Sequence, residues 1–147
     1  MKTSDPLKIA LGTLGYVVVT FLTQGTSHFA INREHYAAVA SLRTEPIFAL
    51  GIASMLIQGS ILSYLYPIFC RGGSSWIKGL GYGVLIGVFF VSYPALAEPG
   101  KYIVPSIPSW IMVEGSVGLI QFGLFGLLLA AIYRSLSDHR VVPAHGP

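Results

Sequence analysis

The sequence predicts an all-α protein, a four-helix transmembrane bundle, and three observations support this fold class. Hydrophobic residues make up 53% of the 147 residues and charged residues only 10%, so a soluble domain of this size would lack a polar shell. The mean hydropathy is +0.68. Four apolar stretches of about 20 residues follow one another, each long enough to cross the hydrocarbon core as a helix.

The four expected spans account for most of the chain, so residues 1–147 are expected to form a single transmembrane domain. The spans cover residues 7–27, 46–69, 77–97 and 110–133. Strands of an outer-membrane barrel would alternate apolar and polar residues over roughly ten positions, whereas these stretches are longer and apolar all round. Among the charged side chains, only Glu114 falls well inside a span.

The basic residues predict the orientation, because short cytoplasmic connections carry an excess of Lys and Arg. One side of the membrane would carry Lys2, Lys8, Arg71, Lys78, Arg134 and Arg140. The other side would carry Arg33, Arg43 and Lys101. The N and C termini are therefore both expected in the cytoplasm. The net charge of +3 is spread over these flanks, so no nucleic-acid partner is indicated.

Two tripeptides each occur twice in the sequence, with nearly the same number of residues between the copies, which suggests two similar helical hairpins. LGY occurs at 14–16 and 80–82, and LIQ occurs at 56–58 and 119–121. An internal duplication would relate the halves by an axis along the membrane normal, and chance recurrence of short apolar words is the equal alternative. In a duplicated bundle, Gln58 and Gln121 would meet near mid-membrane and hydrogen-bond to each other.

Glycines mark the faces where helices are expected to pack, because helices in lipid gain little from hydrophobicity against one another. The predicted helix-packing residues are Gly79, Gly83, Gly87, Gly115 and Gly118. The first three recur every four residues on one span, a spacing typical of close helix contact. A tight bundle is therefore favoured over a wide pore.

Polar residues inside the spans are the candidates for a functional site. A stripe along the first span consists of Thr13, Tyr16, Thr20, Gln24 and Ser27 and ends at His28. Glu114 lies about one turn inside the fourth span, at nearly the depth of Gln24 and His28, and shares a helical face with Gln121. An unpaired carboxylate in hydrocarbon is costly, so we expect Glu114 to face the bundle interior and to bond to Gln24 or pair with His28.

Three interpretations of this polar set stay open. It forms a structural cluster that holds the helices together, or Glu114 reaches to the interface without a further role. Alternatively, it forms a ligand or proton site made of Glu114, His28, Gln24, Gln121 and Gln58.

The two connections on the non-cytoplasmic side are expected to differ. Residues 32–45 carry charges at their ends with Tyr36, Val39, Ala40 and Leu42 between them, which predicts an amphipathic helix on the membrane surface. Residues 98–110 are rich in proline, which predicts ordered, non-helical backbone. Four aromatic residues at span ends are expected to anchor the interfaces: Trp76, Tyr102, Trp110 and Tyr133.

Signatures of catalysis, cofactors and metals are not found in the sequence. The single cysteine, Cys70, excludes an internal disulfide and CxxC chemistry. The histidines lie at or beyond span ends, which disfavours haem held between helices: His28, His35, His139 and His145. No HExxH, GxSxG, P-loop or dinucleotide fingerprint occurs. We therefore expect no cofactor, no metal and no enzymatic activity.

The order of these features resembles a family of small bacterial four-span inner-membrane proteins that is classed as a domain of unknown function. The resemblance is carried by QGTSHF closing the first span, Tyr36 in the following loop, Pro46 opening the second span and YLYP closing it. It continues with GGSSWIKGLGYG and with a last helix that contains Trp110, Glu114 and AAIY. The resemblance implies the fold and a bacterial inner membrane, and it implies no activity.

The expected function is that of a small accessory or scaffolding subunit, which packs against itself or a larger membrane complex and is surrounded by membrane lipids. The main alternative is a small transporter or permeability factor, in which Glu114, Gln121, Gln58, Gln24 and His28 line a path or bind a ligand. An enzyme acting at the outer interface through His28 and Glu114 is a weaker third class.

Overall fold

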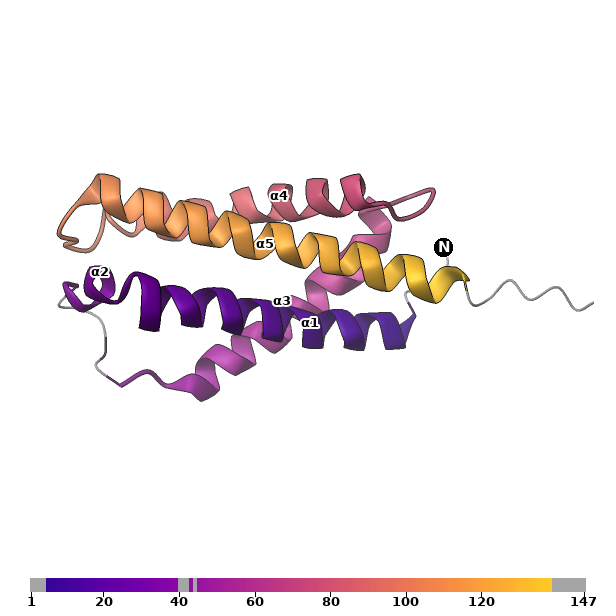
Figure 1. Ribbon diagram of the computed structural model, residues 1–147, viewed down its shortest axis with the longest axis horizontal. Coiled ribbons are helices and arrows are strands. Elements are labelled where there is room, and N and C mark those ends of the chain that lie inside the picture. Colours follow the sequence, from indigo (N-terminus) through magenta and orange to yellow (C-terminus); the bar gives the residue numbers. More distant parts are fainter. Residues whose placement is uncertain (1–4, 40–42, 44, 139–147) are drawn as a thin grey trace, which may run out of the picture.

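The computed structural model describes residues 5–39, 43 and 45–138 and contains helices and connections, with no strand in those ranges. Along the chain the elements are α1 (Pro6–Thr26), η1 (Ser27–Ile31), α2 (Arg33–Ala37), α3 (Phe48–Phe69), α4 (Trp76–Ser92), η2 (Tyr93–Ala97) and α5 (Ile107–Asp138), as Figure 1 shows. The two η elements are π-helical turns that continue α1 and α4. Six residues considered above lie outside the described ranges: Lys2, Ala40, Leu42, His139, Arg140 and His145.

In the described part of the chain, four helices are long and apolar enough to cross a membrane. They cover Pro6–Ile31, Phe48–Phe69, Trp76–Ala97 and Ile107–Ser135. The all-helical fold class with four long apolar helices is therefore confirmed. The first helix is longer than expected because the π-helical turn η1 adds residues to it, and the last helix begins three residues earlier than the expected span.

Local sequence explains where several of these helices begin. Asp5 caps α1, since its side chain accepts a hydrogen bond from Leu7 N at 3.1 Å, and Pro6 suits the first helical position. The short connection between α3 and α4 turns through Gly72 and Gly73, which have φ angles of 83° and 112° that favour glycine. Ser75 next caps α4.

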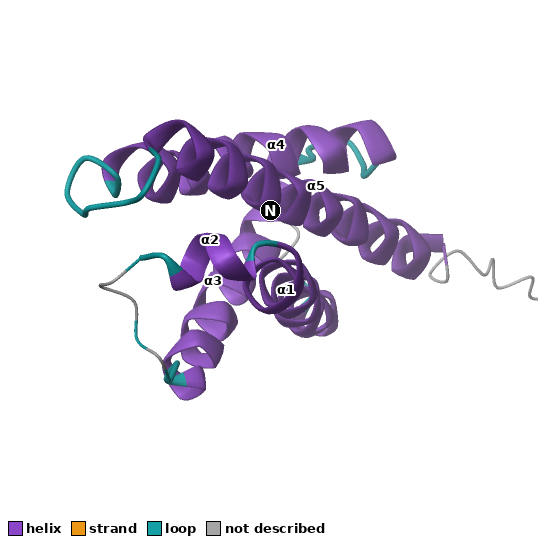
Figure 2. Cartoon of the chain, turned by 60° about the vertical axis from the view of Figure 1, so that its left-hand side comes forward, coloured by secondary structure: helices purple, strands orange, loops and turns teal. Residues whose placement is uncertain are grey.

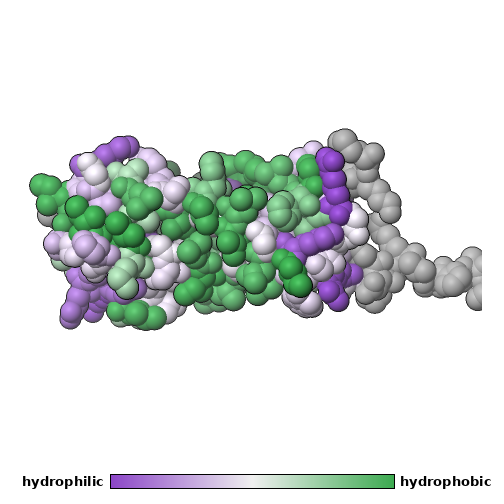
Figure 3. Space-filling model, turned by 90° about the horizontal axis from the view of Figure 1, so that it is seen from above, coloured by the Kyte–Doolittle hydropathy of each residue, from purple (hydrophilic) through white to green (hydrophobic). Residues whose placement is uncertain are grey.

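The four spans pack in the spatial order α3, α1, α5, α4. α1 packs against both α3 and α5, and α4 packs along α5. α3 runs obliquely, so that its last turns approach α4 and α5 while its first turns lie away from them (Figure 1, Figure 2). We call the end where α1 begins and α5 finishes the terminal end, and the opposite end the α2 end. An apolar belt separates more hydrophilic residues at the two ends (Figure 3).

Glycines let α4 and α5 approach to backbone contact. A methyl group at Gly79 would lie 2.5 Å from the carbonyl oxygen of Gly126, and one at Gly83 would overlap the carbonyl oxygen of Phe122. Gly87 also lies against Phe122, at 3.1 Å from its Cβ. This close approach is what the four-residue glycine spacing on α4 predicts.

The two predicted packing glycines of α5 behave differently. A methyl group at Gly118 would overlap the side chain of Val91 on α4. One at Gly115 would have no atom of the described chain within 4 Å, so Gly115 contacts no other helix of this chain and its packing role stays a prediction.

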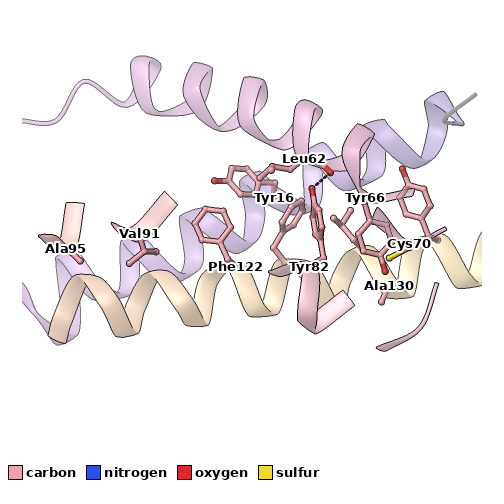
Figure 4. Close-up of a cluster of buried hydrophobic side chains, with 12 residues drawn as sticks. Tyr16, Leu62, Tyr66, Cys70, Tyr82, Val91, Ala95, Phe122 and Ala130 are labelled. Carbon is pink, nitrogen blue, oxygen red and sulfur yellow. Dashed lines mark hydrogen bonds between the residues drawn. The ribbon is translucent and has the colours of Figure 1, made fainter. Parts of the chain in front are cut away.

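The core at the terminal end is aromatic and fully packed (Figure 4). Tyr66, Phe125 and Leu129 are each 0% exposed. The rings of Tyr66 and Tyr82 meet edge to face, with 5.2 Å between centroids. Tyr82 donates its hydroxyl to the carbonyl oxygen of Leu62 at 2.7 Å, so the buried phenol is satisfied.

One hydrogen bond of this core supplies a donor to a backbone carbonyl that a proline leaves without one. Pro67 lies inside α3 and lacks the N–H that the carbonyl oxygen of Ser63, four residues earlier, would accept in a regular helix. Tyr133 of α5 donates its hydroxyl to that oxygen at 2.8 Å. An unpaired carbonyl in the apolar interior is thereby avoided.

A second proline defect lies at the α2 end, in the π-helical turn η2. Bonds in this turn run to the fifth residue, as from Glu98 N to Tyr93 O, so the carbonyl of Pro94 faces Pro99, which has no N–H. The indole N–H of Trp110 donates to Pro94 O at 2.8 Å instead.

These two bonds explain why two expected interfacial anchors are buried. Trp110 is 5% exposed and Tyr133 is 8% exposed, so the prediction that they face the membrane interface was wrong for both. Their polar tips serve backbone carbonyls of the neighbouring helices, which requires burial. Trp76 and Tyr102 are about half exposed, at 50% and 52%, and their anchoring role stays a prediction.

Candidate functional site

A cavity of about 390 Å³ lies between the four spans in the half of the bundle nearer the α2 end. Its lining includes residues of every span, in particular Gln24, Gln58, Glu114 and Gln121, together with Tyr16, Thr20, Ser54, Phe90 and Phe122. Four of the five predicted site residues therefore meet at one cavity. The fifth, His28, lines an adjoining cleft of about 310 Å³ between α1 and α3, to which Gln24 also belongs.

One side of the cavity is an amide network between α1 and α5. Gln24 donates its Nε2 to Oε1 of Gln121 at 2.7 Å, and Gln121 donates its Nε2 to Thr20 Oγ1 at 2.9 Å. Gln121 is only 3% exposed, so the network holds a buried amide in place.

A separate hydrogen bond joins α1 to α3, and a second bond continues it within α3. Tyr16 donates its hydroxyl to Gln58 Oε1 at 2.6 Å, and Gln58 donates its Nε2 to Ser54 Oγ at 3.0 Å. The expected bond between Gln58 and Gln121 is not formed. α3 packs on α1 and barely touches α5, so Gln58 meets Tyr16 instead, and the internal duplication stays a prediction.

Glu114 is held by a residue that lies outside the spans. Tyr36 of α2 donates its hydroxyl to Glu114 Oε1 at 2.7 Å. This bond replaces the expected partners, Gln24 and His28, because α2 folds back against α5 and brings the phenol to the carboxylate. Burial raises the pKa of Tyr36 and the neighbouring Glu114 raises it further, so the phenol keeps its proton as the donor.

Two more side chains extend this contact into a directed chain of hydrogen bonds. Asn32 donates its Nδ2 to Ser27 Oγ at 2.9 Å. The Ser27 hydroxyl lies 3.5 Å from the Tyr36 hydroxyl and is the donor, since Tyr36 gives its own proton to Glu114. Ser27 is 2% exposed, and the chain ends on the carboxylate that lines the cavity.

The imidazole rings of His28 and His35 both contact the ring of Tyr36. His28 stacks on its ring, with 3.6 Å between centroids and an interplanar angle of 11°, and His35 meets it edge to face at 5.3 Å. His28 Nδ1 lies 3.0 Å from the carbonyl oxygen of Gln24 and must donate, because a carbonyl only accepts. His35 also stacks on Trp110, at 5.4 Å.

The segment that carries Tyr36 is shorter than predicted. The amphipathic helix expected over residues 32–45 is reduced to the five residues of α2. Tyr36 and Val39 form a small buried cluster with Trp110, so the apolar side of this segment covers the bundle. Its packing against Trp110 and its bond to Glu114 fix it at the α2 end.

The charges around the cavity are acidic. In the described ranges, Glu114 is the ionisable carboxyl of the lining, and neither Lys nor Arg belongs to it. Burial raises the pKa of Glu98, and the charge of Glu114 raises it further, whereas Lys101 lowers it. The described residues also contain no group of three or more His, Cys, Asp or Glu placed to hold a metal ion.

Sequence reasoning missed the partners of the predicted polar residues. The sequence predicts Tyr36 on the membrane surface, although an aromatic residue directly after a histidine and close to a polar span end was a usable signal. Tyr16 and Thr20 were seen as one stripe, and the structure divides them between Gln58 and Gln121. Nothing local in the sequence distinguishes these two partners.

The fold and the site together define a class: all-helical proteins with four helices apolar enough to span a membrane and a mainly apolar cavity between them that also presents amide and carboxyl groups. No protein-family model, curated protein or solved structure matches the chain. The site is therefore interpreted from its own chemistry.

Proposed function

We propose that this protein is an integral membrane protein that binds a small amphipathic molecule, taken up from the lipid, in the cavity between its four spans. The observation that carries the proposal is the meeting of Gln24, Gln58, Glu114 and Gln121 at one cavity. These polar groups come from three helices. Polar residues that serve only to hold two helices together would be expected as pairs across one helix interface.

The size and the chemistry of the cavity support a small ligand. Its volume of about 390 Å³ lies within the range of roughly 300–1,000 Å³ typical of small-molecule sites. Phe90, Phe122 and Met55 provide apolar contact, and a few amides and one carboxylate provide orientation.

The arrangement of the helices supports access from the lipid and no path through the bundle. α3 diverges from α4 and α5 at the α2 end, and its lining residues Gly51 and Ser54 are exposed there (Figure 2). Toward the terminal end, the packed core of Phe125, Leu129 and Tyr66 closes the cavity. Binding is therefore favoured over conduction.

The location and orientation complete the proposal. We place the protein in a bacterial inner membrane, which the family resemblance supports, with both termini in the cytoplasm. Lys8, Arg71, Lys78 and Arg134 lie on elements that meet at the terminal end, as an excess of cytoplasmic basic residues requires. In this orientation the cavity opens to the outer leaflet. Impermeant thiol labelling of single-cysteine variants at exposed Ser135 and Ala37, in a Cys70→Ser background, tests it.

The experiment for binding uses a substitution that fills the cavity. Gly51 lines the cavity, and a Cβ added there would have no atom within 4 Å, so the backbone of Gly51→Trp is not strained and the indole can fill the site. Gly81→Trp on α4 is the matched control, because Gly81 also faces open space and does not line the cavity. Protein purified in native lipid is analysed by native mass spectrometry. We expect a bound small molecule in the parent and in Gly81→Trp, and its loss in Gly51→Trp.

An accessory subunit is the second candidate function, and one observation favours it. The α2-side half of α3 is largely exposed, with Leu50 exposed by 67% and Ile57 by 63%, so a partner's helix could lie against it. The same purification separates the two functions. A partner would appear as a second protein of fixed stoichiometry, whereas a ligand would appear as a small mass. An equal small mass in both tryptophan variants would overturn the proposed ligand site.

A further inference from the structure

We propose that the ligand of this cavity is a lipid-soluble organic cation, such as a long-chain amine, whose charged nitrogen pairs with Glu114 while its apolar part lies among aromatic rings. This inference rests on the proposed function, since it names the chemical class that the cavity would select. Three independent features of the cavity point to it.

The first feature is an unbalanced carboxylate. Glu114 belongs to the lining, and in the described part of the chain no basic side chain does. The Tyr36 hydroxyl donates to Glu114 Oε1, and Oε2 accepts no hydrogen bond from the described residues. The second oxygen can therefore accept a hydrogen bond from a ligand. A carboxylate at membrane depth is costly without a partner, and an ammonium group supplies both the charge and the hydrogen-bond donors.

The second feature is the aromatic wall next to the polar groups. Phe90 and Phe122 stack with 5.4 Å between centroids, and Tyr16 lies 6.1 Å from Phe122. All three belong to the lining. Aromatic faces attract cations that have left water, and they repel anions.

The third feature is the charge around this end of the bundle. Glu98 lies close enough to Glu114 for the two charges to interact. The nearby Lys101 is fully exposed and donates to the Tyr93 hydroxyl at 3.0 Å, so it offsets the two carboxylates only in part. An anionic ligand would meet net repulsion here, and a neutral one would leave the carboxylate unpaired.

The hydrogen-bonding groups of the lining suit the same class. Glu114 Oε2 and Gln24 Oε1 present oxygen acceptors at the cavity, and Gln58 Oε1 keeps a second lone pair beside the bond from Tyr16. The amide nitrogens of Gln24, Gln58 and Gln121 each already donate one hydrogen bond within the protein. A primary ammonium brings donors and no acceptor, which complements such a site.

The test compares three probes with one chain and different head groups: dodecylamine, dodecanol and dodecanoate. Uptake is measured by equilibrium binding to the full-length protein in zwitterionic nanodiscs, with the uptake of protein-free discs subtracted. We expect dodecylamine to bind at least tenfold more tightly than dodecanol, and dodecanoate to bind most weakly. Glu114→Gln should remove the preference for the amine, and Glu114→Asp should retain it.

Two controls exclude indirect effects. Glu34→Gln removes an exposed carboxylate on α2 that does not line the cavity, and it should leave all three affinities unchanged. Gly51→Trp should abolish binding of every probe. Size-exclusion profiles and thermal unfolding show whether each variant folds, and Glu114→Asp supplies a conservative replacement if Glu114→Gln does not.

The outcomes separate the inference from the function on which it rests. If dodecanol binds as tightly as dodecylamine and Gly51→Trp removes both, the cavity binds neutral amphiphiles and the cation inference is overturned. An amine preference that survives Glu114→Gln would overturn it as well. Failure of all three probes to bind would overturn the inference together with the proposed function.

Discussion

The two halves of the bundle treat polar groups in different ways. At the terminal end, buried hydroxyls of Tyr82 and Tyr133 donate to backbone carbonyls. At the α2 end, Gln24 and Gln121 bond to each other around a cavity, and Glu114 is held by a side chain from a loop helix. Most polar groups of both halves have partners within the bundle, and the kind of partner differs between the halves. Ser63 Oγ in the terminal half and His35 Nε2 in the α2 half are buried without one.

This difference indicates which half can exchange its partners. A phenol bonded to a carbonyl in a packed core has no alternative, because the low dielectric makes an unpaired group costly there. Side chains around a cavity can rotate and bond to a ligand instead of each other. Stability should therefore depend mainly on the terminal half, and binding should depend on the α2 half.

The largest expected effect tests the backbone contact between α4 and α5. Gly83→Ala places a methyl group onto the carbonyl oxygen of Phe122, which cannot move without shifting the helix. We expect a loss of about 3 kcal/mol in the free energy of unfolding, at the upper end of overpacking costs. Unfolding by sodium dodecyl sulfate in mixed micelles measures it.

A matched control lies two residues away on the same helix. Gly81→Ala adds the same methyl group into open space, so its unfolding curve should stay close to that of the parent. Helix propensity alone favours alanine over glycine, so it cannot cause a loss in either variant. Equal losses in the two variants would therefore mean that the close contact with Phe122 has no special role.

The second effect concerns the proline defect in α3. Tyr133→Phe leaves the carbonyl of Ser63 without a donor, because Pro67 cannot supply one, and we expect a loss of about 2 kcal/mol. Tyr82→Phe should cost about 1 kcal/mol or less, since Leu62 O retains the N–H of Tyr66 as its regular helical donor. Unfolding free energies of the two variants give the ranking.

A double variant tests the cause. Pro67→Ala restores an N–H to the helix, so Tyr133→Phe should cost distinctly less in that background than in the parent. A cost that is the same in both backgrounds would assign the role of Tyr133 to its ring packing alone.

The sequence predicted correctly those features that depend on the residues of a single helix. Apolar length and excluded charge predicted four spans, and the four-residue spacing of Gly79 and Gly83 predicted a close face. It also placed Glu114 at nearly the depth of Gln24 and on one helical face with Gln121, because both follow from counting residues along a helix. These three residues do line one cavity.

The sequence was less informative where partners come from different elements. The bond from Tyr36 to Glu114 joins residues 78 positions apart and depends on how α2 folds back. The burial of Trp110 depends on the π-helical turn η2, the element before α5, which no local pattern predicts. Pro67 was a visible signal that a carbonyl needed another donor, but the identity of that donor required the packing of α5 on α3.

The third effect compares two glutamines of the cavity. Gln121→Leu removes a buried amide with bonds to Gln24 and Thr20, and we expect a loss of about 1 kcal/mol, within the range for hydrogen bonds between membrane helices. Gln58→Leu should cost less, because Gln58 is only partly buried and one of its two bonds, to Ser54, lies within α3. A larger cost for Gln58→Leu would place the rigid network on the α3 side, and chemical unfolding of both variants decides the ranking.

The smallest effect concerns Glu98, at the rim of the α2 half. Its pKa is raised above the usual 4.5, mainly by burial and next by the charge of Glu114, so its ionisation disfavours the folded state. The stability that protonated Glu98 contributes is present below pH 4.5 and is lost as the pH rises through the raised pKa. Glu98→Gln should therefore unfold later than the parent at neutral pH, by about 0.5 kcal/mol as for exposed charge pairs. This advantage should vanish below pH 4.5, and an advantage that is independent of pH would show that repulsion from Glu114 is not its cause.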